Sequence, residues 1–237
     1  DEHLRALERV FTKLRESGIT LKCSKTNICS TSFEYLGFTV TKSGIAPIRS
    51  KVSAILEYPR PRNRKQVRSF IGLGVFYRHF IKEASAILEP LHKLCTPSKA
   101  SFTWKAEHEE SFEKFKRNLA NVVEIAHRDP SLPLVLVTDG STKAIAGALH
   151  QKLPSGKLAP LGFFSRALCP AESKLASRYI ELAAVVNSLE YFEDTVYLQP
   201  VTVISDHFSL QKVLEEKRMR KSMPVRVINL IQRLTRF

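Results

Sequence analysis

The chain has 237 residues, of which 37 are Lys or Arg and 23 are Asp or Glu, and its formal net charge is +14. The hydrophobic content of 43% excludes a disordered chain and is enough for a sizeable core or two smaller ones. Apolar runs are far shorter than the roughly 20 residues that cross a bilayer, and no leader is visible, so we expect a soluble protein without a membrane partner. The four cysteines lack the C-x-x-C spacing of a zinc site, which predicts reduced thiols inside a cell. Because the first residue is Asp1 and not an initiating Met, we interpret the sequence as a segment or a processed product.

The positive charge is concentrated in two blocks. Residues 1–100 carry 18 Lys and Arg against 8 Asp and Glu, and residues 211–237 carry 8 against 2, whereas the region between them is close to neutral. Such a field attracts a polyanion, because Lys and Arg release the counterions condensed on phosphates. We favour nucleic acid over an anionic membrane surface. The simpler alternative, that the cations only maintain solubility, accounts for a few charges better than for fourteen.

The first elements predicted are a helix and a hairpin. Residues 4–17 repeat apolar side chains at helical spacing, and Gly18 stands where a left-handed cap is common. Residues 33–48 are rich in aromatic and branched side chains and contain the turn signal Lys42-Ser-Gly44, which predicts short strands.

A helical block follows the hairpin. Ser50 is expected to cap a short helix that ends before Pro59. Asn63 begins the next helix, whose apolar face extends to Ile81. Gly72 and Gly74 lie inside this helix at a cost of about 1 kcal/mol each, so either a ligand approaches the backbone or another helix packs closely against it. A further helix is expected at roughly 106–123.

The remainder reads as mixed strand and helix. Residues 134–138, 145–151 and 158–165 are predicted as consecutive strands of an antiparallel meander. We then expect a helix of about twenty residues from near Ala171, a strand at 201–205, a short helix after His207 and a last helix beginning near Pro224.

Three carboxylates occupy positions that suggest a metal site. Asp139 and Asp206 each follow a predicted strand, and Glu181 lies within an apolar stretch of the predicted helix. Mg²⁺ prefers oxygen ligands, and a pair of such ions can stabilise both the attacking water and the leaving oxygen of a phosphodiester. The order strand–Asp, helix–Glu, strand–Asp therefore indicates a nuclease. Taken singly, each carboxylate has a simpler alternative explanation: Asp139 as a turn residue, Asp206 as a helix cap, and Glu181 as a side chain that reaches the surface.

At these residues the chain resembles the reverse transcriptase and ribonuclease H (RNase H) region of gypsy-type long-terminal-repeat retroelements. The resemblance extends over essentially the whole length and rests on the order of several motifs. These are residues 33–45, similar to the end of the polymerase palm; residues 67–81, similar to the thumb helix; Phe102-Thr-Trp104; and the nuclease-like Thr138-Asp-Gly-Ser141, Phe163-Phe-Ser-Arg166, Glu181-Leu-Ala-Ala-Val185 and Ser205-Asp-His207.

The resemblance implies an α/β (α+β), multidomain chain in four parts. These are the tail of a polymerase palm (1–48), a helical thumb (49–98), a tether or connection (99–131) and a C-terminally truncated RNase H-like mixed sheet with flanking helices (132–237). It also implies an endonuclease that uses Mg²⁺, with Mn²⁺ as a substitute, to cut the RNA strand of an RNA–DNA hybrid. Asp139, Glu181 and Asp206 match the metal ligands and catalytic residues. The implied nucleic-acid contacts are Arg64, Lys65, Arg68, Gly72, Gly74, Tyr77, Arg78, Arg166 and His207.

The resemblance also sets limits. The polymerase catalytic motif would lie before residue 1, and the family's last strand, with a fourth acidic residue, would lie beyond Phe237. We therefore keep open a module that binds nucleic acid without cutting it, and a decayed genomic copy with no selected role. The implied partners are RNA–DNA hybrid, template–primer duplex and the remainder of the polyprotein, and the sequence leaves a dimer open. The implied location is intracellular, in the cytoplasm, a virus-like particle or the nucleus.

Overall fold

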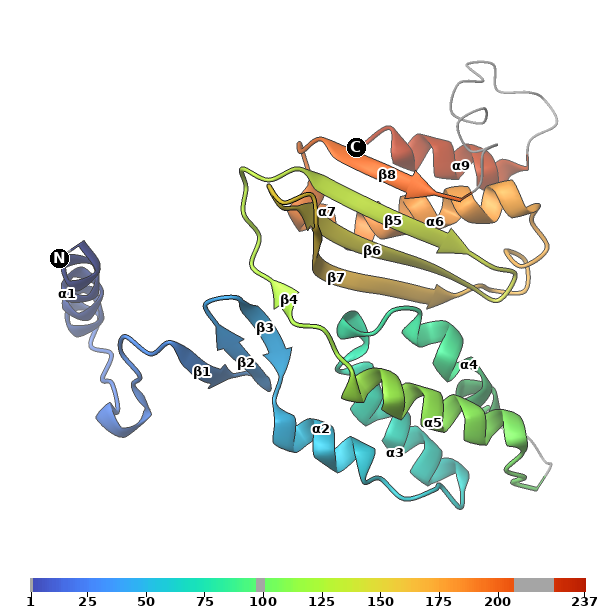
Figure 1. Cartoon of the computed structure of the whole chain (residues 1–237), viewed down its shortest axis with the longest axis horizontal. Helices are drawn as coiled ribbons and strands as arrows, with labels where there is room; N and C mark the ends of the chain where they lie inside the picture. The colour runs from blue at the N-terminus through green and yellow to red at the C-terminus, as the bar shows by residue number, and fades with distance from the viewer. Residues whose placement is uncertain (1, 97–100, 207–223) are drawn as a thin grey trace. The chain divides into compact units, whose positions relative to one another are not determined.

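The computed structural model describes residues 2–96, 101–206 and 224–237 (Figure 1). The chain divides into two compact units, residues 1–33 and 34–237, and each is described by itself. The first unit contains helix α1, Glu2–Glu16, and a 3₁₀ turn, Cys23–Lys25. Gly18 has φ +68°, and its N–H donates to the Arg15 carbonyl at 3.0 Å, which confirms the expected end of this helix. Among the helices of the described ranges, none is long and apolar enough to span a membrane.

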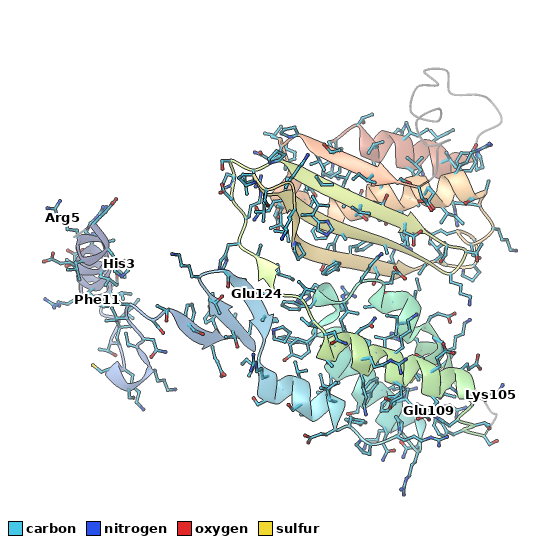
Figure 2. The ribbon with its side chains drawn as sticks, in the orientation of Figure 1. His3, Arg5, Phe11, Lys105, Glu109 and Glu124 are labelled. Atoms are coloured by element: carbon cyan, nitrogen blue, oxygen red, sulfur yellow. The ribbon has the colours of Figure 1, made fainter. Side chains whose placement is uncertain are left out.

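A small sheet opens the second unit. Its strands are β1 (Ser32–Tyr35, which begins in the first unit), β2 (Phe38–Thr41), β3 (Gly44–Pro47) and β4 (Ile125–Ala126). Strands β2 and β3 form the predicted hairpin, with Val40 opposite Ile45. Strand β4 pairs with the other edge of β3, and its neighbour Glu124 accepts hydrogen bonds from Thr41 and Ser43 (Figure 2). This pairing was not predicted, because two residues carry no periodic signal.

Helices form the first core of this unit. They are α2 (Arg49–Leu56), α3 (Arg64–Val75), α4 (Ala84–Cys95) and α5 (Ala106–Ala120), with a 3₁₀ turn at Arg78–Phe80. The Asn63 side chain accepts from the Gln66 N–H at 2.9 Å, as a helix cap should. The apolar stretch predicted as one helix to Ile81 is a helix to Val75 followed by the turn.

Helix α5 is an integral part of this helical core. Phe112 and Phe115 are 1% and 0% exposed, and both rings contact Phe70 of α3. The segment expected as a tether, 99–131, therefore contributes a helix to the same core as the expected thumb.

The two glycines of α3 should respond in opposite ways to alanine. A Cβ atom at Gly74 would lie 2.6 Å from the Phe115 ring, whereas one at Gly72 would meet nothing within 4 Å. We expect Gly72→Ala to raise the free energy of unfolding by about 0.5–1 kcal/mol, because alanine favours the helix. Gly74→Ala should lower it by about 1 kcal/mol or more, because overpacking costs about 1–3 kcal/mol. Urea unfolding of both variants measures the difference, and a stabilised Gly74→Ala would contradict the close packing.

A second sheet and its helices form the other core. The strands are β5 (Leu134–Gly140), β6 (Ala144–Lys152), β7 (Leu158–Ala167) and β8 (Val201–Ser205), in the order β7-β6-β5-β8. The meander β5–β6–β7 is antiparallel, as predicted, and β8 runs parallel to β5. The helices are α6 (Ser177–Tyr191), α7 (Glu193–Val196) and α9 (Val225–Leu234). This mixed α/β architecture confirms the predicted fold class.

Two boundaries in this region differ from the prediction or lie outside the description. The helix expected from Ala171 begins at Ser177, because the preceding residues form turns, such as the one closed by the Glu172 N–H and the Cys169 carbonyl. The short helix expected after His207 lies outside the described residues.

Helix α6 packs against one face of the second sheet and α4 contacts its outer strand (Figure 1). Leu182 and Val186 of α6 are buried against Leu136 of β5. On α4, the Ser85 N–H donates to Ser165 Oγ at 2.9 Å, and Ser85 Oγ donates to the Ser165 carbonyl at 2.8 Å. Paired hydrogen bonds therefore join the helical core to strand β7.

Candidate active site

The parallel pair β5 and β8 brings two carboxylates to one edge of the sheet. Thr138 lies opposite Ser205, and the next residues are Asp139 and Asp206. Both aspartates are exposed. Because the carboxyl ends of neighbouring parallel strands meet at the same edge, the two side chains become neighbours despite their separation in sequence.

Glu181 joins the two aspartates from helix α6. One carboxylate oxygen of each of the three residues lies within 4.8 Å of the others, although Glu181 itself is only 3% exposed. The structure thus brings together the three carboxylates that the sequence singled out. Their role as metal ligands stays a prediction.

Gly140 lets the Glu181 carboxylate lie against the strand. A Cβ atom at Gly140 would stand 3.2 Å from Glu181 Oε1 and 3.0 Å from Ile180 Cγ2. The Gly140 N–H and the Ser205 hydroxyl both donate to this carboxylate, the latter at 3.3 Å. The roles of Gly140 and Ser205 were not predicted from the sequence. The tripeptide Asp139-Gly-Ser141 also fits a turn, and only the folded structure shows that Glu181 approaches Gly140.

Burial raises the pKa of Glu181, and the negative charges of Asp206 and Asp139 raise it further. The Ser205 and Gly140 hydrogen bonds act in the opposite direction. Three converging carboxylates thus repel one another, and a cation would relieve that repulsion. The donors are all oxygen atoms, the set that a hard divalent cation such as Mg²⁺ prefers.

Two of the arginines expected on nucleic acid cap a neighbouring helix. Arg64 Nε donates to the Leu94 carbonyl at 3.3 Å, and Arg68 Nη2 donates to the Cys95 carbonyl at 2.9 Å. These are carbonyls of the last turn of α4, which lack partners within the helix and carry its negative dipole end. Arg64 and Arg68 therefore have a structural role that the sequence did not reveal.

Of the other residues predicted to contact nucleic acid, some are exposed and others are buried. Gly72, Lys65 and Arg78 are exposed. Tyr77 is only 3% exposed, and its ring packs against Phe38, so the expected surface role of Tyr77 is not supported. Gly74 is buried against Phe115, so the close approach at this glycine is helix packing. His207 lies outside the described residues.

Arg166 is held by neighbours within the nuclease-like part. Its guanidinium donates to both carboxylate oxygens of Glu172, at 2.9 and 3.0 Å, and to Asn187 Oδ1 at 3.3 Å. These bonds from Arg166, together with the Cys169 N–H, lower the pKa of Glu172 from 4.5 to about 2. Local spacing gave no signal for this pair, because Glu172 lies in an irregular segment.

Glu172→Gln should lower the free energy of unfolding at pH 7 by about 1–2 kcal/mol, since a partly exposed ion pair gives less than its full pKa shift. The lowered pKa means that the ionised Glu172 stabilises the fold fully above pH 4.5, and that this contribution is lost as the pH falls toward about 2. The two proteins should therefore converge in stability in acid. Denaturant unfolding at several pH values measures this.

Glu193→Gln is the matched control for Glu172→Gln, because its partner is Arg236 and the two side chains are 39% and 57% exposed. We expect a change below about 1 kcal/mol in this control. An unchanged Glu172→Gln variant at pH 7 would contradict the importance of the Arg166 pair.

Comparison with protein families and known relatives agrees with this geometry. Residues 104–203 match the model of the RNase H-like domain found in reverse transcriptase. The match begins at Trp104 and ends within β8, so it includes α5 as well as β5, β6 and β7. The Transposon Tf2-3 polyprotein of Schizosaccharomyces pombe (strain 972 / ATCC 24843) is 26% identical over 213 residues, which cover 88% of this chain and 16% of the polyprotein. The Tf2-4 polyprotein of the same organism gives the same values.

Solved structures are similar over nearly the whole chain. The foamy viral protease-reverse transcriptase in complex with RNA/DNA hybrid has a TM-score of 0.81 and 27% identity, covering 98% of this chain and 32% of that one. The foamy viral protease-reverse transcriptase in complex with dsDNA has a TM-score of 0.80 and 27% identity, covering 99% and 49%. The chain thus spans a minor part of these longer relatives. It carries an RNase H-like domain of the kind found in the reverse transcriptases of retrotransposon and retroviral polyproteins.

Proposed function

We propose that this chain is the thumb and RNase H region of a gypsy-type retrotransposon reverse transcriptase, and that it binds RNA–DNA hybrid and hydrolyses the RNA strand. The observation that carries the proposal is the cluster of Asp139, Glu181 and Asp206, whose ligand atoms lie within 4.8 Å of one another. We place the protein inside the cell as part of a longer polyprotein.

The three carboxylates would hold Mg²⁺, with Mn²⁺ as a substitute. When bound, such ions supply an activated water and charge stabilisation for phosphodiester hydrolysis. The two exposed aspartates offer oxygens toward solvent, whereas the buried Glu181 is oriented by the Gly140 N–H and the Ser205 hydroxyl. The site is thus organised by backbone and hydroxyl donors before any cation arrives.

The charge of the chain supports a nucleic-acid substrate. A net charge of +14 favours binding to a nucleic-acid backbone. Contacts to phosphates do not distinguish one base from another, so the preference for particular nucleotide sequences should be slight. Contacts to 2′-hydroxyls in a wide minor groove would distinguish the RNA strand from DNA.

Cleavage of an end-labelled RNA–DNA hybrid with Mg²⁺ and with Mn²⁺ tests the proposal. We expect Asp139→Asn to remove cleavage and to weaken Mn²⁺ binding measured by electron paramagnetic resonance. The matched control is Asp194→Asn, which removes the same charge from an exposed residue of helix α7. Equal cleavage by wild type and Asp139→Asn would overturn the assignment. Hybrid binding without cleavage in the wild type would support the non-catalytic module instead.

A further inference from the structure

A groove of about 510 Å³ lies in the helical region, and none of the three clustered carboxylates lines it. Its volume is within the range typical of ligand sites. It lies between the segment before α3 and the segment before α5. The lining residues are Pro59, Arg60, Pro61, Arg62, Phe102 and Trp104.

One wall of the groove is aromatic and rigid. Phe102 and Trp104 are half-buried, with ring centroids 6.3 Å apart. The indole N–H of Trp104 donates to Glu109 of α5, which is labelled in Figure 2, at 2.5 Å. The indole also packs edge-on against the buried Phe112. A ring already fixed in this way loses little entropy when a flat group stacks on its exposed part.

The other wall is cationic. The Arg60 guanidinium lies over the Trp104 ring at 5.8 Å and pairs with Glu109 at 3.1 Å. The side chain of Arg62 is exposed and makes no hydrogen bond or ion pair with the described part of the chain. Pro59 and Pro61 fix their own φ angles, which stiffens the segment that carries the arginines. The groove therefore combines a flat apolar surface with one cation, Arg62, that is not neutralised by a carboxylate.

We propose that this groove binds single-stranded nucleic acid, with a base stacked on Phe102 and Trp104 and a flanking phosphate on Arg62. Aromatic rings beside cations are the usual surface for unpaired bases, whose faces are free to stack, whereas those of a duplex are covered by neighbouring pairs. The charge complementarity favours a polyanion over a proline-rich peptide, which would leave Arg62 unpaired. This inference rests on the proposed function in one respect, that the chain binds nucleic acid.

Trp104 provides a direct test, because it is the only tryptophan in the 237 residues. A uridine oligomer of about ten nucleotides matches the usual site size for single strands. Titrated into the full chain in EDTA, it should quench Trp104 fluorescence in a saturable, salt-dependent way. A blunt-ended RNA–DNA hybrid should quench it less.

Two variants separate the cation from the aromatic contribution. We expect Arg62→Gln to weaken binding about 3- to 10-fold and to reduce the salt slope by about 0.7. Phe102→Leu, which keeps an apolar side chain, should weaken it about 5-fold or more. Lys157→Gln, an exposed cation on the β6–β7 turn, is the matched control and should bind normally.

Absence of quenching, unchanged affinity in both groove variants, or equal quenching by the blunt hybrid would overturn the inference. Quenching by a proline-rich peptide but not by the oligomer would also overturn it. Asp139→Asn separates the two proposals, since it should remove hybrid cleavage and leave quenching intact. Intact cleavage without quenching would refute the groove alone, and quenching without cleavage would refute the nuclease alone.

Discussion

Glu181→Gln is expected to remove hybrid cleavage and, in the absence of divalent cations, to stabilise the protein. Cleavage should fall by more than about 100-fold. Losing a residue that only supports a metal ligand costs about 10- to 100-fold, and losing the ligand itself should cost more. The free energy of unfolding should rise by on the order of 1 kcal/mol at neutral pH, because the substitution removes a buried charge that Asp206 and Asp139 repel. Cleavage assays and denaturant unfolding in EDTA measure the two effects.

The pH dependence of this stabilisation has a definite sign. Folding raises the pKa of Glu181 above 4.5. Protonated Glu181 therefore makes its full contribution to the stability of wild type below pH 4.5, and this contribution is lost as the pH rises through the pKa of the folded state. The variant should therefore exceed wild type in neutral solution and match it in acid. Mg²⁺ should stabilise wild type more than the variant.

Glu190→Gln on the same helix is the contrasting control for Glu181→Gln. Glu190 Oε1 accepts from Arg233 Nε at 2.6 Å, so its loss should destabilise the protein without affecting cleavage. A destabilised Glu181→Gln variant in EDTA at neutral pH would show that the three carboxylates do not repel one another as we describe.

Gly147→Ala is expected to lower the free energy of unfolding by about 2–3 kcal/mol, the cost of overpacking a tight contact. A Cβ atom at Gly147 of β6 would lie 2.1 Å from Ser188 Oγ and 2.7 Å from Ser188 Cβ. Ser188 is 0% exposed on α6, the helix that also carries Glu181. The substitution would push this helix away from the sheet, so cleavage should fall together with stability. Urea unfolding and the hybrid cleavage assay measure both.

Ser188→Ala identifies the cause of the Gly147→Ala effect. Ser188 Oγ is buried without a hydrogen-bond partner among the described residues, so Ser188→Ala alone should be close to neutral. Combined with Gly147→Ala, it should recover part of the lost stability, because one of the two close contacts disappears. Additive destabilisation in the double variant would rule out the steric explanation.

Strong local patterns were enough to locate the strands and the three candidate carboxylates. Short apolar runs located β5, β6 and β7, and strand ends located Asp139 and Asp206. Glu181 was found because a carboxylate is unexpected within an apolar helix. These features depend on near neighbours in the chain, which sequence patterns record directly.

Features that depend on distant partners became visible only in the folded chain. Pro90 argues locally against a helix, yet α4 contains it because Leu88 and Leu91 are buried in the helical core. Arg68 could be assigned to a helix end only once α3 and α4 lay side by side, and Tyr77 to the core only once Phe38 packed against it. Exposure, capping by a residue of another helix, and ion pairing between distant residues are properties of the packed chain, because each requires a partner that no local spacing specifies.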